Sequence, residues 1–118
     1  EFLERVPPQD FYIPGSILGL ELTGEHRMAD DVPGEIAAWY WRTSRAFDLA
    51  DGSARVLARY ADGDPLRSGW LLGPDFVAGQ PAILEADVGR GSVVLFGFQP
   101  NYRAQTMATW PHLFNAIL

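Results

Sequence analysis

Residues 81–100 contain two apolar runs joined by a short glycine-containing turn, and this pattern limits the possible folds more than any other part of the chain. The runs Pro81–Val88 and Ser92–Phe98 flank Gly89-Arg90-Gly91. Three-residue hairpin loops commonly need glycine where the backbone is left-handed, so the pattern predicts a β-hairpin. In the second run both alternating sets of side chains are apolar or small. This strand is therefore expected to be covered on both faces, as a central strand rather than an edge strand.

Shorter patterns before the hairpin predict further strands. Apolar residues alternate in Ser16–Leu22, and aromatic residues concentrate in Glu35–Trp41, so each segment is expected to be a strand. Two β-like runs, Arg45–Leu49 and Ser53–Ala61, predict a second hairpin. Gly73-Pro74-Asp75 predicts the start of an irregular or one-turn helical segment, because proline is favoured at the first position of a helix.

The end of the chain predicts an amphipathic helix. Apolar residues recur there at helical spacing, at Trp110, Leu113, Phe114, Ile117 and Leu118. This stripe is expected to face the core. Pro111 fits if the helix begins late, with Thr109 as its N-cap; otherwise a kink near Trp110 is expected. Together the elements predict an α/β fold with a mixed, mainly antiparallel sheet, a closing hairpin and a C-terminal helix.

Length and charge limit the possible partners. A chain of 118 residues with 47% hydrophobic residues has the size of one domain and can bury a core, so residues 1–118 are expected to form a single domain. The net charge of -6 repels nucleic acid and anionic membranes. No apolar run approaches the ~20 residues of a membrane span. Glu1–Val6 resembles the last turn of a helix that Pro7-Pro8 ends, so the chain is expected to be a fragment of a longer protein.

No complete catalytic or metal site is predicted. The chain has no cysteine and two histidines, His26 and His112, whereas a zinc site normally takes three or four ligands. Both histidines are therefore expected at the surface or in a helix cap. The carboxylate pairs Asp30-Asp31 and Asp62-x-Asp64 lack the rest of a calcium loop and are interpreted as solvated turns. No serine lies in a G-x-S-x-G elbow.

Polar residues after the hairpin form the best candidate surface. Arg103, Gln105 and Thr106 follow a strand, at the place where α/β sheets put functional loops, and they are candidate ligand-binding residues. In the alternative, Arg103 pairs with a carboxylate and Gln105 or Thr106 caps the helix.

Three consecutive aromatic residues, Trp39-Tyr40-Trp41, give a further candidate. They cannot all face one core, because successive strand residues point to opposite faces. At least one is expected near the surface, as a sugar platform or as a contact with another domain. Trp41 is therefore added to the candidate ligand-binding residues.

Several segments share features with one known family. They are Phe11–Ser16, 26–33, Gly69–Gly73, Pro81–Glu85, Gly89–Pro100, Tyr102–Thr106 and Leu113–Ala116. Together they resemble the C-terminal region of bacterial zinc carboxypeptidases of the M14 peptidase family that carry an appended class I glutamine amidotransferase-like domain. The resemblance spans most of the chain and is most specific at its end.

The resemblance implies a parent enzyme that removes C-terminal residues from peptides, with zinc in an upstream domain and no cofactor in these residues. The His-x-x-Glu metal motif of the family has no match here. Class I amidotransferases use a cysteine nucleophile and a His-Pro-Glu segment, but the chain has no cysteine and Gln99 stands where the histidine is expected. The implied domain is thus a partial amidotransferase-like (flavodoxin-like) domain, non-catalytic, docked on its own peptidase domain, in a secreted or periplasmic protein.

Two other functions stay open. One is a ligand-binding module for glycans or peptides that uses Trp41 or the loop around Arg103 and Gln105. The other is structural homodimerisation through an uncovered sheet face. Nothing in the residues alone decides between these functions and a docking role.

Overall fold

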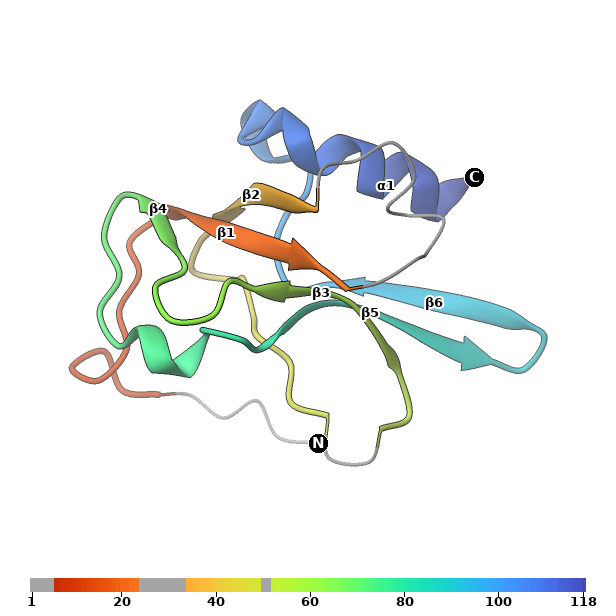
Figure 1. The fold of residues 1–118 in the computed structure, drawn as a ribbon, viewed down its shortest axis with the longest axis horizontal. Helices are drawn as coiled ribbons and strands as arrows, with labels where there is room; N and C mark the ends of the chain where they lie inside the picture. The colour runs from red at the N-terminus through yellow and green to blue at the C-terminus, as the bar shows by residue number, and fades with distance from the viewer. Residues whose placement is uncertain (1–5, 24–33, 50–51) are drawn as a thin grey trace.

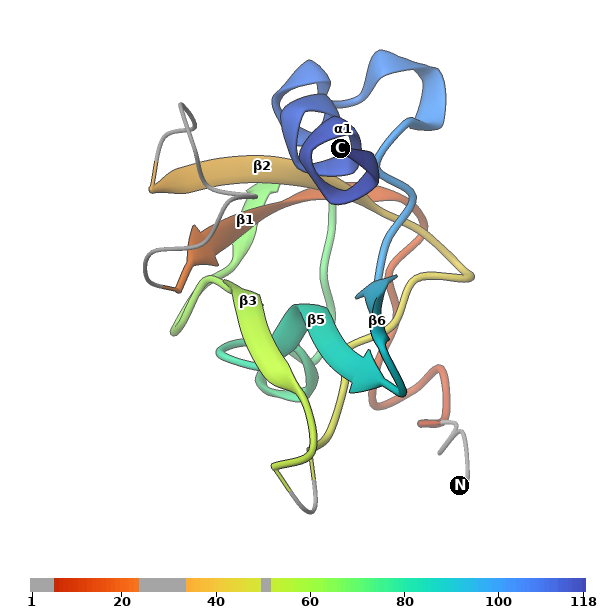
Figure 2. The same ribbon diagram turned by 90° about the vertical axis from the view of Figure 1, so that its right-hand side faces the viewer.

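A curled antiparallel sheet with a helix laid across it forms the fold of the computed structural model, which describes residues 6–23, 34–49 and 52–118 (Figure 1). The strands are β1 Ser16–Leu22, β2 Glu35–Tyr40, β3 Arg55–Tyr60, β4 Leu66–Ser68, β5 Pro81–Val88 and β6 Gly91–Phe96. The order along the sheet is β2-β1-β3-β5-β6, and β4 pairs with β1. Figure 2 shows the curl, with the helix α1, Trp110–Ile117, near β2.

Local sequence patterns account for most of these elements. Alternation in β1 turns Leu18 and Leu20 into the core, and the predicted bounds of this strand are confirmed. The aromatic strand β2 pairs with it from Ser16↔Tyr40 to Glu21↔Glu35, as an antiparallel neighbour. The predicted one-turn segment is the 3-10 helix η2, Pro74–Phe76, which begins with its proline.

The predictions of a mixed sheet and of a second hairpin were wrong. All pairings between the described strands are antiparallel, so the described sheet has no parallel component. Arg45–Leu49 forms no strand with β3. Instead the N–H of Arg45 donates to the carbonyl of Gly97 at 2.5 Å, and that of Phe47 donates to the carbonyl of Pro81 at 3.0 Å. The segment's backbone donors are thus used at the ends of β5 and β6.

The closing hairpin forms as predicted, with a shorter loop and a different place in the sheet. Val88 pairs with Gly91, so the loop is the two-residue turn Gly89-Arg90, and Gly89 has a φ of 60°, as the first position of a type II′ turn requires. The prediction that the second strand is central was wrong, because β6 ends the strand order. Val93 and Leu95 are 43% and 44% exposed. Apolar residues on both faces of a strand do not determine whether another strand pairs with its edge.

The C-terminal helix begins where predicted but is rotated. It starts at Trp110, with Pro111 in its first turn and Thr109 at the N-cap, although the Thr109 hydroxyl bonds to the carbonyls of Pro100 and Thr106 rather than capping. The prediction that the apolar stripe faces the core was wrong, since Phe114 is 54% and Ile117 74% exposed. No helix among the described residues is long and apolar enough to cross a membrane.

The inward side of α1 carries small and polar residues instead. Thr109 and His112 are fully buried, and Ala116 packs against the core. These residues share one face because they lie three and four positions apart. The prediction that His112 is a surface or capping residue was therefore wrong.

Tyr60 lies at the centre of the core and connects it to the 45–49 segment. Its ring meets that of Tyr40 edge-on, with centroids 5.5 Å apart, and its hydroxyl donates to the carbonyl of Arg45 at 2.8 Å. Burial raises the pKa of Tyr60 well above 10. Burial also raises the pKa of Tyr40 to about 12, against a smaller lowering by the charge of Arg45. Both phenols are thus neutral core groups.

Candidate functional site

Three aromatic side chains form a cluster at the end of β2. Trp39 and Trp41 lie on one face of the chain, while Tyr40 between them points into the core, because alternate strand residues share a face. Tyr102, in the 3-10 turn η3 (Tyr102–Ala104), stacks on Trp39 with centroids 5.6 Å apart and planes 3° apart. It also meets Trp41 at 5.7 Å and 43°. Trp39, Trp41 and Tyr102 are named the aromatic cluster below.

Gly15 makes room for this cluster. Its φ is 137°, and a Cβ there would lie 2.8 Å from Cη2 of Trp39 and 3.4 Å from Cδ1 of Trp41. The Trp39 indole therefore lies directly against the backbone of Gly15. Its Nε1 is buried and has no hydrogen-bond partner among the described residues. Trp39 is thus enclosed by Gly15 and by the ring of Tyr102.

The predicted ligand-binding residues lie in or next to the aromatic cluster, and each makes a different contact. The guanidinium carbon of Arg103 lies 5.8 Å from the Tyr102 ring centroid, within the range of a cation–π contact. The hydroxyl of Thr106 donates to the carbonyl of Ala37 in β2 and does not cap a helix. Gln105 is exposed, and its backbone N–H donates to the carbonyl of Tyr102 at 2.7 Å. Trp41 and Arg103 therefore meet at Tyr102, whereas Thr106 fastens the segment to the sheet.

Tyr102 is the residue that sequence reasoning missed as part of this site. It stands immediately before Arg103, but no local pattern indicates that its ring reaches β2. The left-handed backbone of Arg103, with φ 46°, and of Ala104, with φ 57°, makes the tight turn that follows it. The residue types do not indicate this turn, because non-glycine residues rarely adopt a positive φ.

Two rings of the aromatic cluster, those of Trp39 and Tyr102, leave little open surface for a ligand. The parallel stack uses one face each of Trp39 and Tyr102, and Gly15 lies against Trp39. Stacking of a sugar requires a free aromatic face. The cluster therefore holds residues 101–109 on β2, and Arg103 and Gln105 remain as exposed polar groups at its edge.

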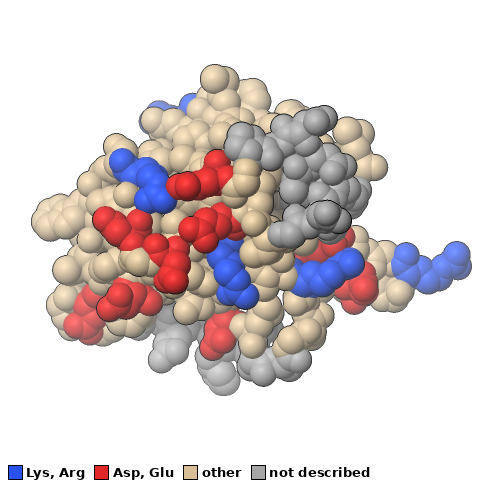
Figure 3. Space-filling model, in the orientation of Figure 1, with Lys and Arg blue, Asp and Glu red and all other residues tan. Residues whose placement is uncertain are grey.

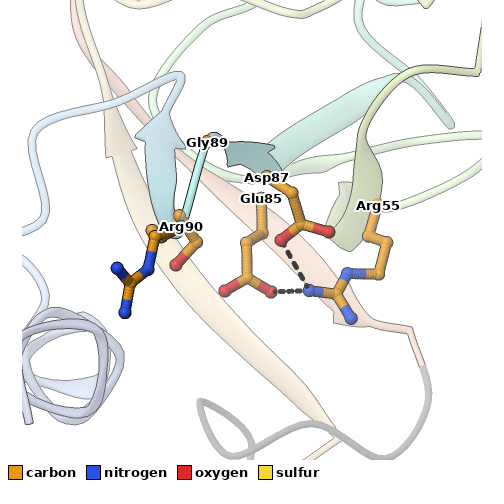
Figure 4. Close-up of a pocket in the computed structure, with 7 residues that line it drawn as sticks. Arg55, Glu85, Asp87, Gly89 and Arg90 are labelled. Carbon is orange, nitrogen blue, oxygen red and sulfur yellow. Dashed lines mark hydrogen bonds and ion pairs between the residues drawn. The ribbon is translucent and has the colours of Figure 1, made fainter.

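A second polar group of residues lies near the turn of the hairpin, in an open hollow of about 480 Å³ (Figure 4). Arg55 Nη2 lies 2.9 Å from Glu85 Oε2 and 3.7 Å from Asp87 Oδ1. Glu85 is only 4% exposed, so Arg55 supplies the charge that a buried carboxylate needs. Arg90 points away from this pair in Figure 4. One guanidinium, that of Arg55, thus links two carboxylates of β5 to β3 and supports the hairpin.

The remaining predicted polar residues lie in turns or outside the described residues. Asp62 Oδ1 accepts from the N–H of Gly63 at 2.9 Å, and Asp64 Oδ1 from that of Leu66 at 3.1 Å, which confirms the predicted turn. His26, Asp30-Asp31 and the first five residues lie outside the described residues. Within 6–23, 34–49 and 52–118, no group of three His, Asp or Glu residues is placed to hold a metal.

An apolar surface on α1 is the other candidate for function. Phe114 and Ile117, together with Leu118 after the helix, are exposed, and are named the α1 apolar face below. The helix lies on the outside of the sheet, so this face points to solvent (Figure 1). An exposed apolar stripe on a helix is typical of a surface that contacts another protein or domain.

Comparisons of the chain with protein-family models, with curated proteins and with solved structures gave no match. Function therefore has to be inferred from three features of the molecule. These are the aromatic cluster, the ion pair at Glu85 and the α1 apolar face.

Proposed function

We propose that the chain is a non-catalytic accessory domain that docks onto a larger polypeptide through the α1 apolar face. The exposure of Phe114 and Ile117, 54% and 74%, carries this proposal. Fully burying one such side chain contributes roughly 1.5–3 kcal/mol, so a partner that covers both gains a substantial part of a binding energy. The inward side of the same helix, formed by Thr109, His112 and Ala116, is already packed within the domain.

The partner in this proposal is the peptidase domain of the same parent protein. The resemblance described above supports a secreted or periplasmic zinc carboxypeptidase of the M14 family as the parent, with zinc held in that upstream domain. The hairpin and α1 carry most of the likeness, and they would form the closing part of a class I amidotransferase-like, flavodoxin-like domain. In this proposal Gln99, which is exposed just after Phe98, stands where the resemblance expects the histidine.

An activity assay tests the non-catalytic part of the proposal. The purified chain is expected to show no glutaminase and no carboxypeptidase turnover, with or without added zinc, because it has no cysteine and no family metal motif. An active amidotransferase and an active carboxypeptidase serve as controls for the two assays. Turnover that stays with the chain through purification and changes in Gln99→Ala would contradict the proposal.

A ligand-binding module for glycans or peptides is the second candidate function. It is favoured by the meeting of Trp41 and Arg103 at Tyr102, and by the exposure of Arg103 and Gln105. The occupied ring faces of the aromatic cluster favour the docking role over this one. Binding of a glycan or peptide panel, lost in Arg103→Ala or Trp41→Ala, would reverse that order.

A further inference from the structure

The strand β6 has the composition of a central strand but stands at the edge of the sheet. Gly91–Phe96 contains no charge and no proline, and both of its faces carry apolar residues. Proteins usually protect an edge strand with charges, proline or a bulge. None of these devices is present in β6, and among the described residues no strand lies on its outer side.

The register of the hairpin shows which backbone groups are left at this edge. The two-residue turn makes Val88 and Gly91 a hydrogen-bonded pair, and such pairs recur at every second residue of an antiparallel ladder. The bond from the N–H of Gly97 to the carbonyl of Ala82, at 2.8 Å, follows the same alternation. The N–H and C=O groups of Ser92, Val94 and Phe96 therefore point away from β5.

The opposite edge of the sheet is different. On β2, the carbonyl of Ala37 accepts a hydrogen bond from the hydroxyl of Thr106, and the segment that follows the hairpin lies beside this strand. Of the two strands that end the order β2-β1-β3-β5-β6, β2 thus has a segment bonded to its outer edge, whereas β6 has none among the described residues.

We propose that two copies of the chain pair antiparallel through the outer edges of β6 and form one continuous sheet. With Val94 opposite its own counterpart, Ser92 lies opposite Phe96 of the second copy, so the outward backbone groups pair with one another. The same register sets Val93 opposite Leu95 of the second copy. These pairs lack mutual backbone bonds and therefore bring their side chains closest, which removes exposed apolar surface on both copies.

Charge favours a second copy as the occupant of this edge. The net charge of -6 opposes self-association at long range, but β6 is uncharged, and Arg55 and Arg90 balance Glu85 and Asp87 around the hairpin. Figure 3 shows most acidic side chains of the visible face in its left half, the end where Figure 1 places β4 and η2. On the visible face most acidic side chains thus lie away from the hairpin, and the interface uses neither the α1 apolar face nor the aromatic cluster.

Sedimentation velocity over a range of protein concentrations tests the proposal. The wild-type mass is expected to rise from 13.1 kDa toward twice that value as concentration increases. Val93→Lys should weaken association about tenfold or more, because it places a charge opposite Leu95 of the second copy. Val88→Lys is the matched control: Val88 is 60% exposed on the same hairpin but lies on β5, outside the pairing edge, and should associate like wild type.

Amide hydrogen exchange of the wild type gives a second readout that needs no variant. Protection of the Ser92, Val94 and Phe96 amides should rise with protein concentration, while that of Val93 and Leu95 stays constant. The proposal is overturned by a wild-type mass that stays at 13.1 kDa, by equal effects of Val93→Lys and Val88→Lys, or by concentration-independent protection of all these amides.

Discussion

Replacing Gly97 by alanine is expected to lower the free energy of unfolding by about 3 kcal/mol or more. A Cβ at this position would lie 2.2 Å from the carbonyl oxygen of Arg45 and 3.2 Å from the Tyr60 hydroxyl. Backbone would have to move, because the nearest atom is not the end of a flexible side chain. The bonds from Arg45 to Gly97 and from Tyr60 to Arg45 would be disturbed together. Urea unfolding followed by circular dichroism measures the change.

Gly91→Ala is the matched control for this substitution. Gly91 begins β6, the strand that Gly97 follows, but a Cβ there meets only the carbonyl oxygen of Val88, at 3.9 Å. Its effect should stay within about 0.5 kcal/mol. Equal losses in the two variants would show that the close approach at Gly97 does not hold the 45–49 segment on the sheet.

Replacing Tyr102 by alanine is expected to cost about 2–3 kcal/mol of stability. The substitution removes the stack on Trp39 and the tilted contact with Trp41, which together hold residues 101–109 on β2. Unfolding in urea, monitored by tryptophan fluorescence, measures the loss of stability.

Tyr12→Ala serves as the comparison, because the Tyr12 side chain is exposed and its segment is held by backbone bonds to Leu72. It is expected to cost less than about 1 kcal/mol. If Tyr102→Ala costs no more than Tyr12→Ala, the aromatic cluster does not anchor the segment, and a ligand platform becomes the better interpretation of Trp41.

The elements that sequence predicted best are those in which one local pattern decides the outcome. Apolar residues alternate at Leu18, Leu20 and Leu22, and this segment forms β1 with the predicted bounds Ser16–Leu22. Pro111 marks the start of α1 correctly. Alternation and proline geometry act within a few residues, so they hold whatever the rest of the chain does.

The errors concern what lies next to an element. Apolar residues on both faces of β6 predict a covered strand, but whether a neighbour exists depends on the whole topology. The apolar stripe of α1 predicts that the segment is helical. Which side of the helix is buried, that of His112 or that of Ile117, depends on how the helix packs on the sheet. Both errors expose apolar surface, which is why they point to partners rather than to a poorly packed core.

The candidate site was predictable only in part for the same reason. Trp41 and Arg103 were expected to be functional, and they do meet, but through Tyr102, whose contact spans more than sixty positions of sequence. Long-range stacking leaves no periodic signal in the chain. The resemblance to an amidotransferase-like domain remains a prediction.

Calorimetric titration of the chain with the catalytic domain of a bacterial M14 zinc carboxypeptidase that carries such an appended domain tests the docking role most directly. Wild type and Thr43→Glu, a control charge at another exposed position, are expected to bind. Ile117→Glu is expected to abolish binding without loss of stability, because Ile117 is 74% exposed in the free chain. No binding by wild type, or equal binding by Ile117→Glu, would contradict the proposed function and leave the pairing of β6 edges unaffected.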